Sequence, residues 1–270
     1  MHGVAINENI GTYRDWDDYV SWIEQAHPGQ VTIALNAYNG WDSTKPMYTQ
    51  VYDIYQLILT ITNGNSTFDE GYHLIGHSQG ALILRSIIEM FGLPVENFIS
   101  LAGMHQGVYG YGDLSQQPYG NFTEYELTKI FYTETLQNLF SIANWWNDPT
   151  DQNGYILGNE FLPVINQQLP NPMVNMKSNF IKSIQGSLYA FGSPQDGTIV
   201  PWVTELFGFF DDKFNLLNMT ETPIYINDTF GLKTLDQQQK LFIYELPDIK
   251  HTQWLTNQEI FENYILDVLT

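Results

Sequence analysis

The sequence contains no cysteine. Disulfide bonds, thiolate nucleophiles, cysteine-ligated zinc and iron–sulfur clusters are therefore all excluded, and any nucleophile must be an oxygen, or less often a Lys or His side chain. Basic residues are also scarce, because 10 Lys and Arg stand against 30 Asp and Glu, for a net charge of −20. So negative a chain repels phosphates and anionic headgroups, which argues against nucleic-acid binding.

Long hydrophobic runs are missing as well. Stretches such as residues 54–61 are interrupted by polar side chains and fall short of the roughly 18 residues that cross a bilayer, so no transmembrane segment is expected. No apolar signal region stands before His2, so we expect either that a leader has been removed or that the sequence begins inside a longer chain. With 270 residues, 43% hydrophobic and 15% charged, the composition fits one globular domain over residues 1–270.

Four Asn-x-Ser/Thr motifs indicate passage through the secretory route, where such asparagines are glycosylated. The candidate glycosylation sites are Asn65, Asn121, Asn218 and Asn227. The low lysine content favours the same interpretation. The alternative is that a chain rich in Asn and Thr forms such motifs by chance.

Helix-like and strand-like hydrophobic patterns alternate along the chain. We expect helices over residues 16–27, 46–63, 81–92 and 256–269. Short buried strands are expected over residues 31–35, 71–75, 98–102, 187–191 and 240–246. The alternation is lost over about residues 104–184, which are rich in Gln, Asn, Pro and aromatic residues and which we interpret as a helical cap insertion. The pattern predicts an α/β fold with a doubly wound, mostly parallel sheet.

Residues 76–80 read Gly-His-Ser-Gln-Gly and match the nucleophile-elbow pattern Gly-x-Ser-x-Gly. In that motif, small flanking residues let a strand turn sharply into a helix and leave a serine hydroxyl at the apex of the turn. An apolar strand is expected before the motif and an apolar helix after it, as the motif requires. Ser78 is therefore the candidate nucleophile. The alternative is a tight turn whose serine only caps the next helix.

A serine nucleophile needs a base, and in this kind of fold the acid and the histidine follow the serine, each just past a strand end. Among the six histidines, only His251 lies late in the chain, between the expected strand 240–246 and the last helix. Asp196, which follows strand 187–191, is the favoured acid. Asp248 also lies near His251, but so short a separation on a loop seldom lets a carboxylate reach the imidazole from behind. The carboxylate would fix the tautomer of the histidine and stabilise the imidazolium.

The opening residues His2-Gly3-Val4 look like the loop that completes an oxyanion hole after the third strand of this fold. The backbone amides of Val4 and Gln79 would then donate to the developing oxyanion, at roughly 3 kcal/mol per donor. The alternative is that these are turn residues only. Because such a loop ends a strand, we also expect an upstream strand of about six to eight residues ending at His2, which this sequence lacks.

The expected cap carries a group of apolar side chains. They would line a tunnel for an alkyl chain, at about 0.8 kcal/mol for each buried methylene, or form a small satellite core that closes the cap onto the sheet. The group comprises Leu136, Leu139, Phe140, Trp145, Trp146, Leu162, Val164 and Ile165.

Several motifs together resemble the palmitoyl-protein thioesterase family. The elbow Gly-His-Ser-Gln-Gly-Ala with a following Leu-Arg-Ser is similar to the family's own, and Ser-Leu-Ala-Gly-Met-His-Gln-Gly is similar to the strand and turn that follow it there. Further similar stretches occur in the family's order at residues 161–166, 177–180, 196–202, 207–210, 231–236 and 251–254. Trp202 and Trp254 look closer to the second, lysosomal thioesterase branch than to the first.

The resemblance implies an α/β-hydrolase fold, with Ser78, Asp196 and His251 as the triad and Val4 and Gln79 as the oxyanion donors. It further implies a glycosylated hydrolase, lysosomal or secreted, that works without a metal or cofactor. Its substrates would be S-acylated proteins or peptides, or acyl thioesters of the acyl-CoA type. Animal members carry disulfides, which this chain lacks.

Three functions remain open from the residues. The first is a thioesterase that passes through an acyl-serine intermediate. The second keeps the same triad but acts as an oxygen-ester lipase or acyltransferase, since serine and an oxyanion hole treat both acyl groups alike. The third is a catalytically inactive lipid- or partner-binding descendant, against which the three filled triad positions argue. The resemblance favours the first.

Overall fold

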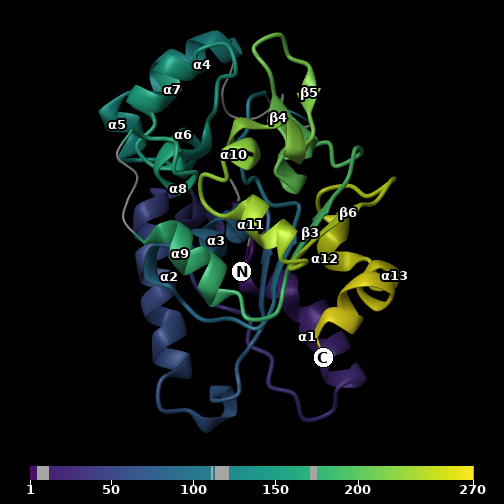
Figure 1. Ribbon diagram of the computed structural model, residues 1–270. Helices are drawn as coiled ribbons and strands as arrows, with labels where there is room; N and C mark the ends of the chain where they lie inside the picture. The colour runs from purple at the N-terminus through teal and green to yellow at the C-terminus, as the bar shows by residue number, and fades with distance from the viewer. Residues whose placement is uncertain (5–11, 111, 113–121, 171–174, 270) are drawn as a thin grey trace.

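The computed structural model describes residues 1–4, 12–110, 112, 122–170 and 175–269. A four-stranded sheet, ordered β1–β2–β3–β6 and parallel throughout, lies at its centre (Figure 1). The strands are β1 (Leu74–His77), β2 (Phe98–Leu101), β3 (Leu188–Gly192) and β6 (Leu241–Glu245). Each overlaps a strand expected from the sequence, so the parallel α/β sheet is confirmed.

Helices cover both faces of this sheet. Because successive strand residues point to opposite faces, Phe98 packs in one hydrophobic core and Ile99 in the other. The first core also receives α2 (Met47–Thr62), α3 (Gln79–Phe91) and α9 (Met176–Ser183). The second receives α1 (Asp17–Ala26), α12 (Gln253–Thr256) and α13 (Gln258–Ile260), and helical turns continue from α13 over Phe261–Ile265 and Leu266–Leu269. The result is the three-layer arrangement that the alternating pattern predicts.

Between β2 and β3, the described residues form five short α-helices before α9. They are α4 (Glu124–Phe131), α5 (Glu134–Gln137), α6 (Ser141–Trp145), α7 (Gln152–Gly158) and α8 (Leu162–Ile165). Figure 1 shows them gathered at one end of the molecule, whereas α9 packs along α3. After β3 come a two-stranded hairpin, β4 (Phe209–Phe210) and β5 (Leu216–Leu217), and the helices α10 (Pro223–Ile226) and α11 (Leu232–Gln237).

The apolar side chains expected in the cap are divided between core and surface. Trp145, Trp146, Leu162 and Ile165 are buried and belong to the same core as α2 and α3. Leu139 and Phe140 are exposed, at 52% and 43%. The buried members therefore join the cap to the main body rather than form a separate satellite core.

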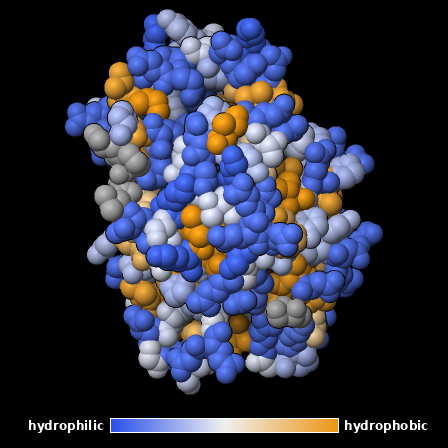
Figure 2. All heavy atoms as spheres, in the orientation of Figure 1, coloured by the Kyte–Doolittle hydropathy of each residue, from blue (hydrophilic) through white to orange (hydrophobic). Residues whose placement is uncertain are grey.

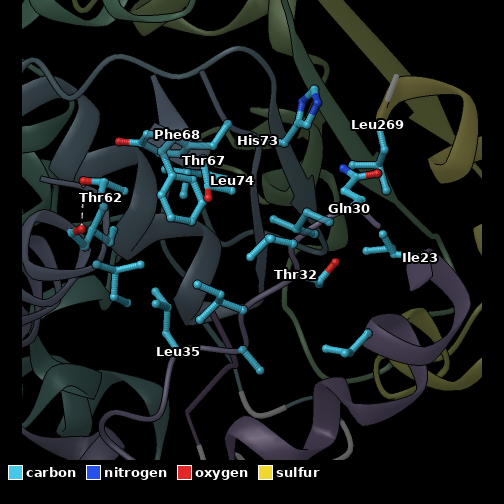
Figure 3. A pocket seen from close by; sticks show the side chains of 18 of the residues that line it. Ile23, Gln30, Thr32, Leu35, Thr62, Thr67, Phe68, His73, Leu74 and Leu269 are labelled. Carbon is cyan, nitrogen blue, oxygen red and sulfur yellow. Dashed lines mark hydrogen bonds between the residues drawn. The ribbon is translucent and has the colours of Figure 1, made fainter. Parts of the chain in front are cut away.

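Residues 31–35 do not form the strand expected from their apolar pattern. They have no ladder partner in the described part of the chain. A cavity of about 570 Å³ is lined by residues 31–35 together with Leu74 and Ile75 of β1; Figure 3 labels Thr32, Leu35 and Leu74 among its lining residues. Paired strands lie only about 4.8 Å apart, so the cavity leaves this segment without a partner. The expected burial is not found either, because Val31 and Ile33 are exposed, at 51% and 47%.

The chain's first residue lies at the same edge of β1. The Met1 amine donates to the carbonyl oxygen of Ile75 at 2.7 Å, and the His77 N–H donates to the Met1 carbonyl oxygen at 3.0 Å. The ring of His2 hydrogen-bonds to the carbonyl oxygens of Gly3 and Ala37, both at 2.8 Å. These contacts hold the first residues against the carboxyl end of β1.

The surface is mainly hydrophilic on the face shown in Figure 2, with hydrophobic side chains in small separate groups. Within the described residues, no helix combines the length and the hydropathy that crossing a bilayer requires.

Helix α3 contains a fully buried ion pair. Arg85 Nε lies 3.3 Å from Glu89 Oε1, and both side chains are completely buried. Arg85 also donates to Asn166 Oδ1 at 2.7 Å and lies over the ring of Phe230 at 4.8 Å. Burial opposes both charges: it lowers the pKa of Arg85 and raises the pKa of Glu89, while each charge favours the other. Each buried charge is therefore stabilised by the charge of its partner.

We expect Glu89→Leu to lower the free energy of unfolding by about 3–5 kcal/mol, because Arg85 would be left as a buried charge without its counter-ion. Replacing both partners by Arg85→Met and Glu89→Leu should recover most of this loss. Chemical denaturation measures each value. The control is Lys45→Met, which breaks the exposed Lys45–Asp42 pair at 2.8 Å and should cost less than about 1 kcal/mol. A double variant as unstable as the single one would contradict the prediction.

Candidate active site

Ser78 stands at the turn between β1 and α3. Its backbone has φ 56° and ψ −128°, a conformation that a residue with a Cβ seldom adopts. The turn is fixed by the Ser78 N–H, which donates to the Leu101 carbonyl oxygen of β2 at 2.9 Å. Ser78 is 3% exposed. The described geometry is thus the strained strand-to-helix turn that the Gly-x-Ser-x-Gly pattern indicates.

The two motif glycines allow this turn for different reasons. A Cβ on Gly76 would lie 2.6 Å from the Cα of Ala81, so the strand and the first turn of α3 could not approach as closely. A Cβ on Gly80 would collide with the carbonyl oxygens of Met1 and His2. Gly76 therefore permits the sharp turn, and Gly80 permits the chain's first residues to pass beside the serine.

Asp196 and His251 are in direct contact. His251 Nδ1 lies 2.7 Å from Asp196 Oδ2, and the His251 N–H donates to the Asp196 carbonyl oxygen at 3.0 Å. Asp196 follows β3 and His251 follows β6, so the carboxyl ends of two adjacent parallel strands bring the side chains together. Asp248 does not take part in this contact. Its backbone N–H donates to Gln195 Oε1 at 2.7 Å.

The surroundings of Asp196 favour its ionised form. The side chain is buried, which by itself raises the pKa of a carboxyl group. The hydrogen bond and charge of His251, together with the N–H groups of Thr198 at 3.0 Å and Ile199 at 2.9 Å, outweigh burial and lower the pKa of Asp196. A carboxylate held in this way keeps its negative charge beside the imidazole.

His77 links the elbow to His251. Its Nε2 lies 2.9 Å from the His251 carbonyl oxygen, and the two imidazole rings are 4.5 Å apart. Burial, followed by the charge of His251, lowers the pKa of His77 to about 3, so this imidazole is neutral. Within the described residues, Ser78 and His251 themselves form no hydrogen bond. The place of His77 next to Ser78 in the elbow motif is the sequence signal for its position at the site.

The expected oxyanion donors belong to two segments that meet at the serine. Gln79 is the first residue of α3, so its backbone N–H has no acceptor within the helix. A Cβ on Gly3 would lie 2.8 Å from the Cβ of Ser78, which places the segment ending at Val4 against the serine. The Gln79 side chain is tied down separately: its Nε2 donates to the Ser43 carbonyl oxygen at 2.8 Å, and its Oε1 accepts from Trp145 Nε1 at 3.0 Å. The cap is thereby joined to the elbow.

The large cavity is separate from this site. Its lining includes none of Ser78, Asp196 and His251, and none of the cap residues expected to form a tunnel. Within the described residues, no three His, Asp or Glu side chains are grouped in a way that would hold a metal ion. The candidate site therefore consists of the residues around the elbow and the carboxyl ends of β3 and β6.

Three of the four candidate glycosylation sites fall within the described residues. Asn65, Asn218 and Asn227 are exposed. Asn121 lies outside the described residues.

The comparisons with known proteins agree on one family. The family model for palmitoyl protein thioesterase matches residues 1–251. Lysosomal thioesterase PPT2-B of Xenopus laevis is 32% identical, covering 99% of this chain and 92% of the relative. Lysosomal thioesterase PPT2 of Homo sapiens is 33% identical, covering 91% and 80%. Palmitoyl-protein thioesterase 1 of Caenorhabditis elegans is 30% identical, covering 74% and 67%.

Solved structures give more distant similarities. A monoacylglycerol lipase of Paleococcus ferrophilus has a TM-score of 0.47 at 14% identity, covering 98% of this chain and 96% of that one. The expected family and fold are thus confirmed by the family match, the curated relatives and the parallel sheet with its elbow. The chain belongs to the palmitoyl protein thioesterase family and is a thioester hydrolase with an α/β-hydrolase fold.

Proposed function

We propose that this protein hydrolyses long-chain fatty acyl thioesters, of S-acylated proteins or peptides or of the acyl-CoA type, through an acyl-serine intermediate on Ser78. The observation that carries the proposal is the strained turn that holds Ser78 at the start of α3, at the same sheet end as the Asp196–His251 pair. The lysosomal thioesterase relatives support the substrate class.

In this mechanism Ser78 Oγ attacks the thioester carbonyl carbon while His251 Nε2 takes its proton. Asp196 holds the imidazole through Nδ1 and stabilises the imidazolium that forms. The backbone N–H groups of Val4 and Gln79 donate to the oxyanion. The thiol leaves with the proton from His251, and a water molecule, activated by His251, then hydrolyses the acyl-serine. The Ser78–His251 hydrogen bond has to form on substrate binding, as is common for catalytic contacts that are loose in a free enzyme.

We propose a lysosomal location and glycosylation at the exposed sequon asparagines. The relatives are lysosomal thioesterases by name, which supports the first. The exposure of Asn65, Asn218 and Asn227 supports the second, because an oligosaccharide requires a surface position.

We expect turnover of a palmitoyl thioester peptide to exceed that of a matched palmitoyl oxygen ester by at least about tenfold, or about 1.4 kcal/mol in the barrier. A thiolate is a much weaker base than an alkoxide and leaves more readily. Measuring kcat/KM for both substrates, with an acetyl thioester as the chain-length control, tests the proposal. Faster turnover of the oxygen ester would favour the lipase or acyltransferase alternative, and absence of turnover with all three would favour an inactive descendant.

A further inference from the structure

A second carboxyl group is buried behind Asp196. Glu205 lies on a short 3₁₀ helix, Trp202–Leu206, and its side chain is completely buried. Its Oε2 accepts the Ser193 N–H at 2.9 Å, whereas Oε1 meets no donor in the described part of the chain. The Asp196 carboxyl group lies within hydrogen-bond reach of it. Neither group can donate to the other unless one of them carries a proton.

The surrounding donors decide which carboxyl group carries that proton. Asp196 accepts from two backbone N–H groups and contacts His251, whereas Glu205 accepts from one N–H. Asp196 is therefore the better site for the negative charge. Burial and the neighbouring charge of Asp196 raise the pKa of Glu205 well above the usual range. A protonated Glu205 would also give its otherwise unsatisfied carboxyl group a partner.

The position of Glu205 is fixed by its neighbours. A Cβ on Gly192 of β3 would lie 2.9 Å from both Cβ and Oε2 of Glu205, so the side chain packs directly against the strand that leads to Asp196. The adjacent Thr204 accepts the Gln106 N–H at 2.8 Å, and the Gln106 side chain donates to the Phe207 carbonyl oxygen. The 3₁₀ helix is thus held on both sides of Glu205.

Few other titratable groups surround Glu205. The strands packed on its helix are β3 and β6, which contribute Tyr189, Tyr244 and Glu245. None of these is a cause of its raised pKa, for which Asp196 is the one titratable neighbour among the described residues.

We propose that Glu205 is a positioning residue for this site: its protonated carboxyl group donates a hydrogen bond to the Asp196 carboxylate and so fixes the side chain that orients His251. The inference rests on the proposed function of Ser78, Asp196 and His251. At metal sites, losing the hydrogen bond of a group that orients a metal ligand changes activity by about 10–100-fold. We expect a loss of activity of similar size when Glu205 no longer orients Asp196.

The experiment compares Glu205→Gln, which keeps a donor without an ionisable proton, with Glu205→Ala, which keeps none. We expect kcat for Glu205→Gln to stay within about threefold of the wild-type value and kcat for Glu205→Ala to fall about 10–100-fold, with KM nearly unchanged in both. Leu206→Ala, on the same helix and buried, controls for lost packing and should keep its kcat. If Glu205→Ala does not fold, Glu205→Met replaces it, because methionine fills the space without a donor.

Two further readouts separate positioning from a purely structural role. In the wild type, the infrared spectrum should contain the carbonyl stretch of a protonated carboxylic acid that the Glu205→Gln spectrum lacks. As pH rises through the pKa of Glu205, the wild type should lose its donor and therefore activity, and Glu205→Gln should not show this alkaline loss. Absence of the infrared band, equal impairment of Gln and Ala variants, or normal kcat in Glu205→Ala would each overturn the inference.

Ser78→Ala is assayed in parallel. If Ser78→Ala keeps its activity, the proposed function itself fails. If Ser78→Ala is inactive while Glu205→Ala is normal, only the role of Glu205 fails.

Discussion

Replacing Ser78 with alanine is expected to lower kcat for a palmitoyl thioester by at least about 10⁴-fold. The variant loses the attacking oxygen, and no acyl intermediate can form on it. The fold should persist, because alanine and serine both carry a Cβ and share whatever strain φ 56° imposes. Steady-state kinetics measure the loss, thermal unfolding checks the fold, and a fluorophosphonate probe should label the wild type but not the variant.

Ser86→Ala is the matched control for that result. Ser86 lies on helix α3, which follows Ser78, is also buried, and donates to the Leu82 carbonyl oxygen at 2.7 Å. Its loss should cost about 1 kcal/mol of stability and leave both labelling and kcat near the wild-type values. Retention of more than a few per cent of activity in Ser78→Ala would rule out Ser78 as the nucleophile.

The elbow was predictable because several local requirements coincide within a few residues. The pattern required a strand before Ser78 and a helix after it, and the structure has β1 and α3 at these places. The glycines have physical reasons that a sequence pattern encodes: Gly76 lies against Ala81, and Gly80 against the carbonyl oxygens of Met1 and His2. The contact between Gly76 and Ala81 is local, so the motif itself encodes it, whereas the contact of Gly80 with Met1 and His2 joins segments far apart in the sequence.

Contacts between distant segments were much less predictable. The pattern of residues 31–35 is that of a strand, but pairing depends on a partner that the pattern does not describe. Glu205 reads as an ordinary acidic residue, and only the close approach of its helix to β3 reveals a buried carboxyl group beside Asp196. Likewise, the sequence does not indicate that the indole N–H of Trp145 donates to Gln79. These roles depend on tertiary contacts between segments that are distant in the sequence, and a single sequence does not show which segments meet.

The second large effect on kcat is expected from replacing Asp196, the acid favoured over Asp248. We expect Asp196→Asn to lower kcat by about 10⁴-fold, by analogy with the loss of the acid in a serine protease triad. The amide would present an N–H₂ group or a weaker acceptor to His251 Nδ1, now 2.7 Å from the carboxylate, so the imidazole would hold the wrong tautomer and its protonated form would lose the compensating charge. Kinetics with the same palmitoyl thioester measure the loss.

Asp248→Asn removes a carboxylate from the same neighbourhood and serves as its control. Asp248 has φ 63°, a left-handed conformation that asparagine adopts readily, and its own N–H donates to Gln195. The substitution should therefore preserve the loop and leave kcat near the wild-type value. The opposite ranking, with Asp248→Asn inactive and Asp196→Asn normal, would transfer the role of the acid to Asp248. Both variants remove one negative charge near His251, so a general electrostatic effect would lower kcat equally in both. A lower kcat in Asp196→Asn alone would indicate a specific contact with His251.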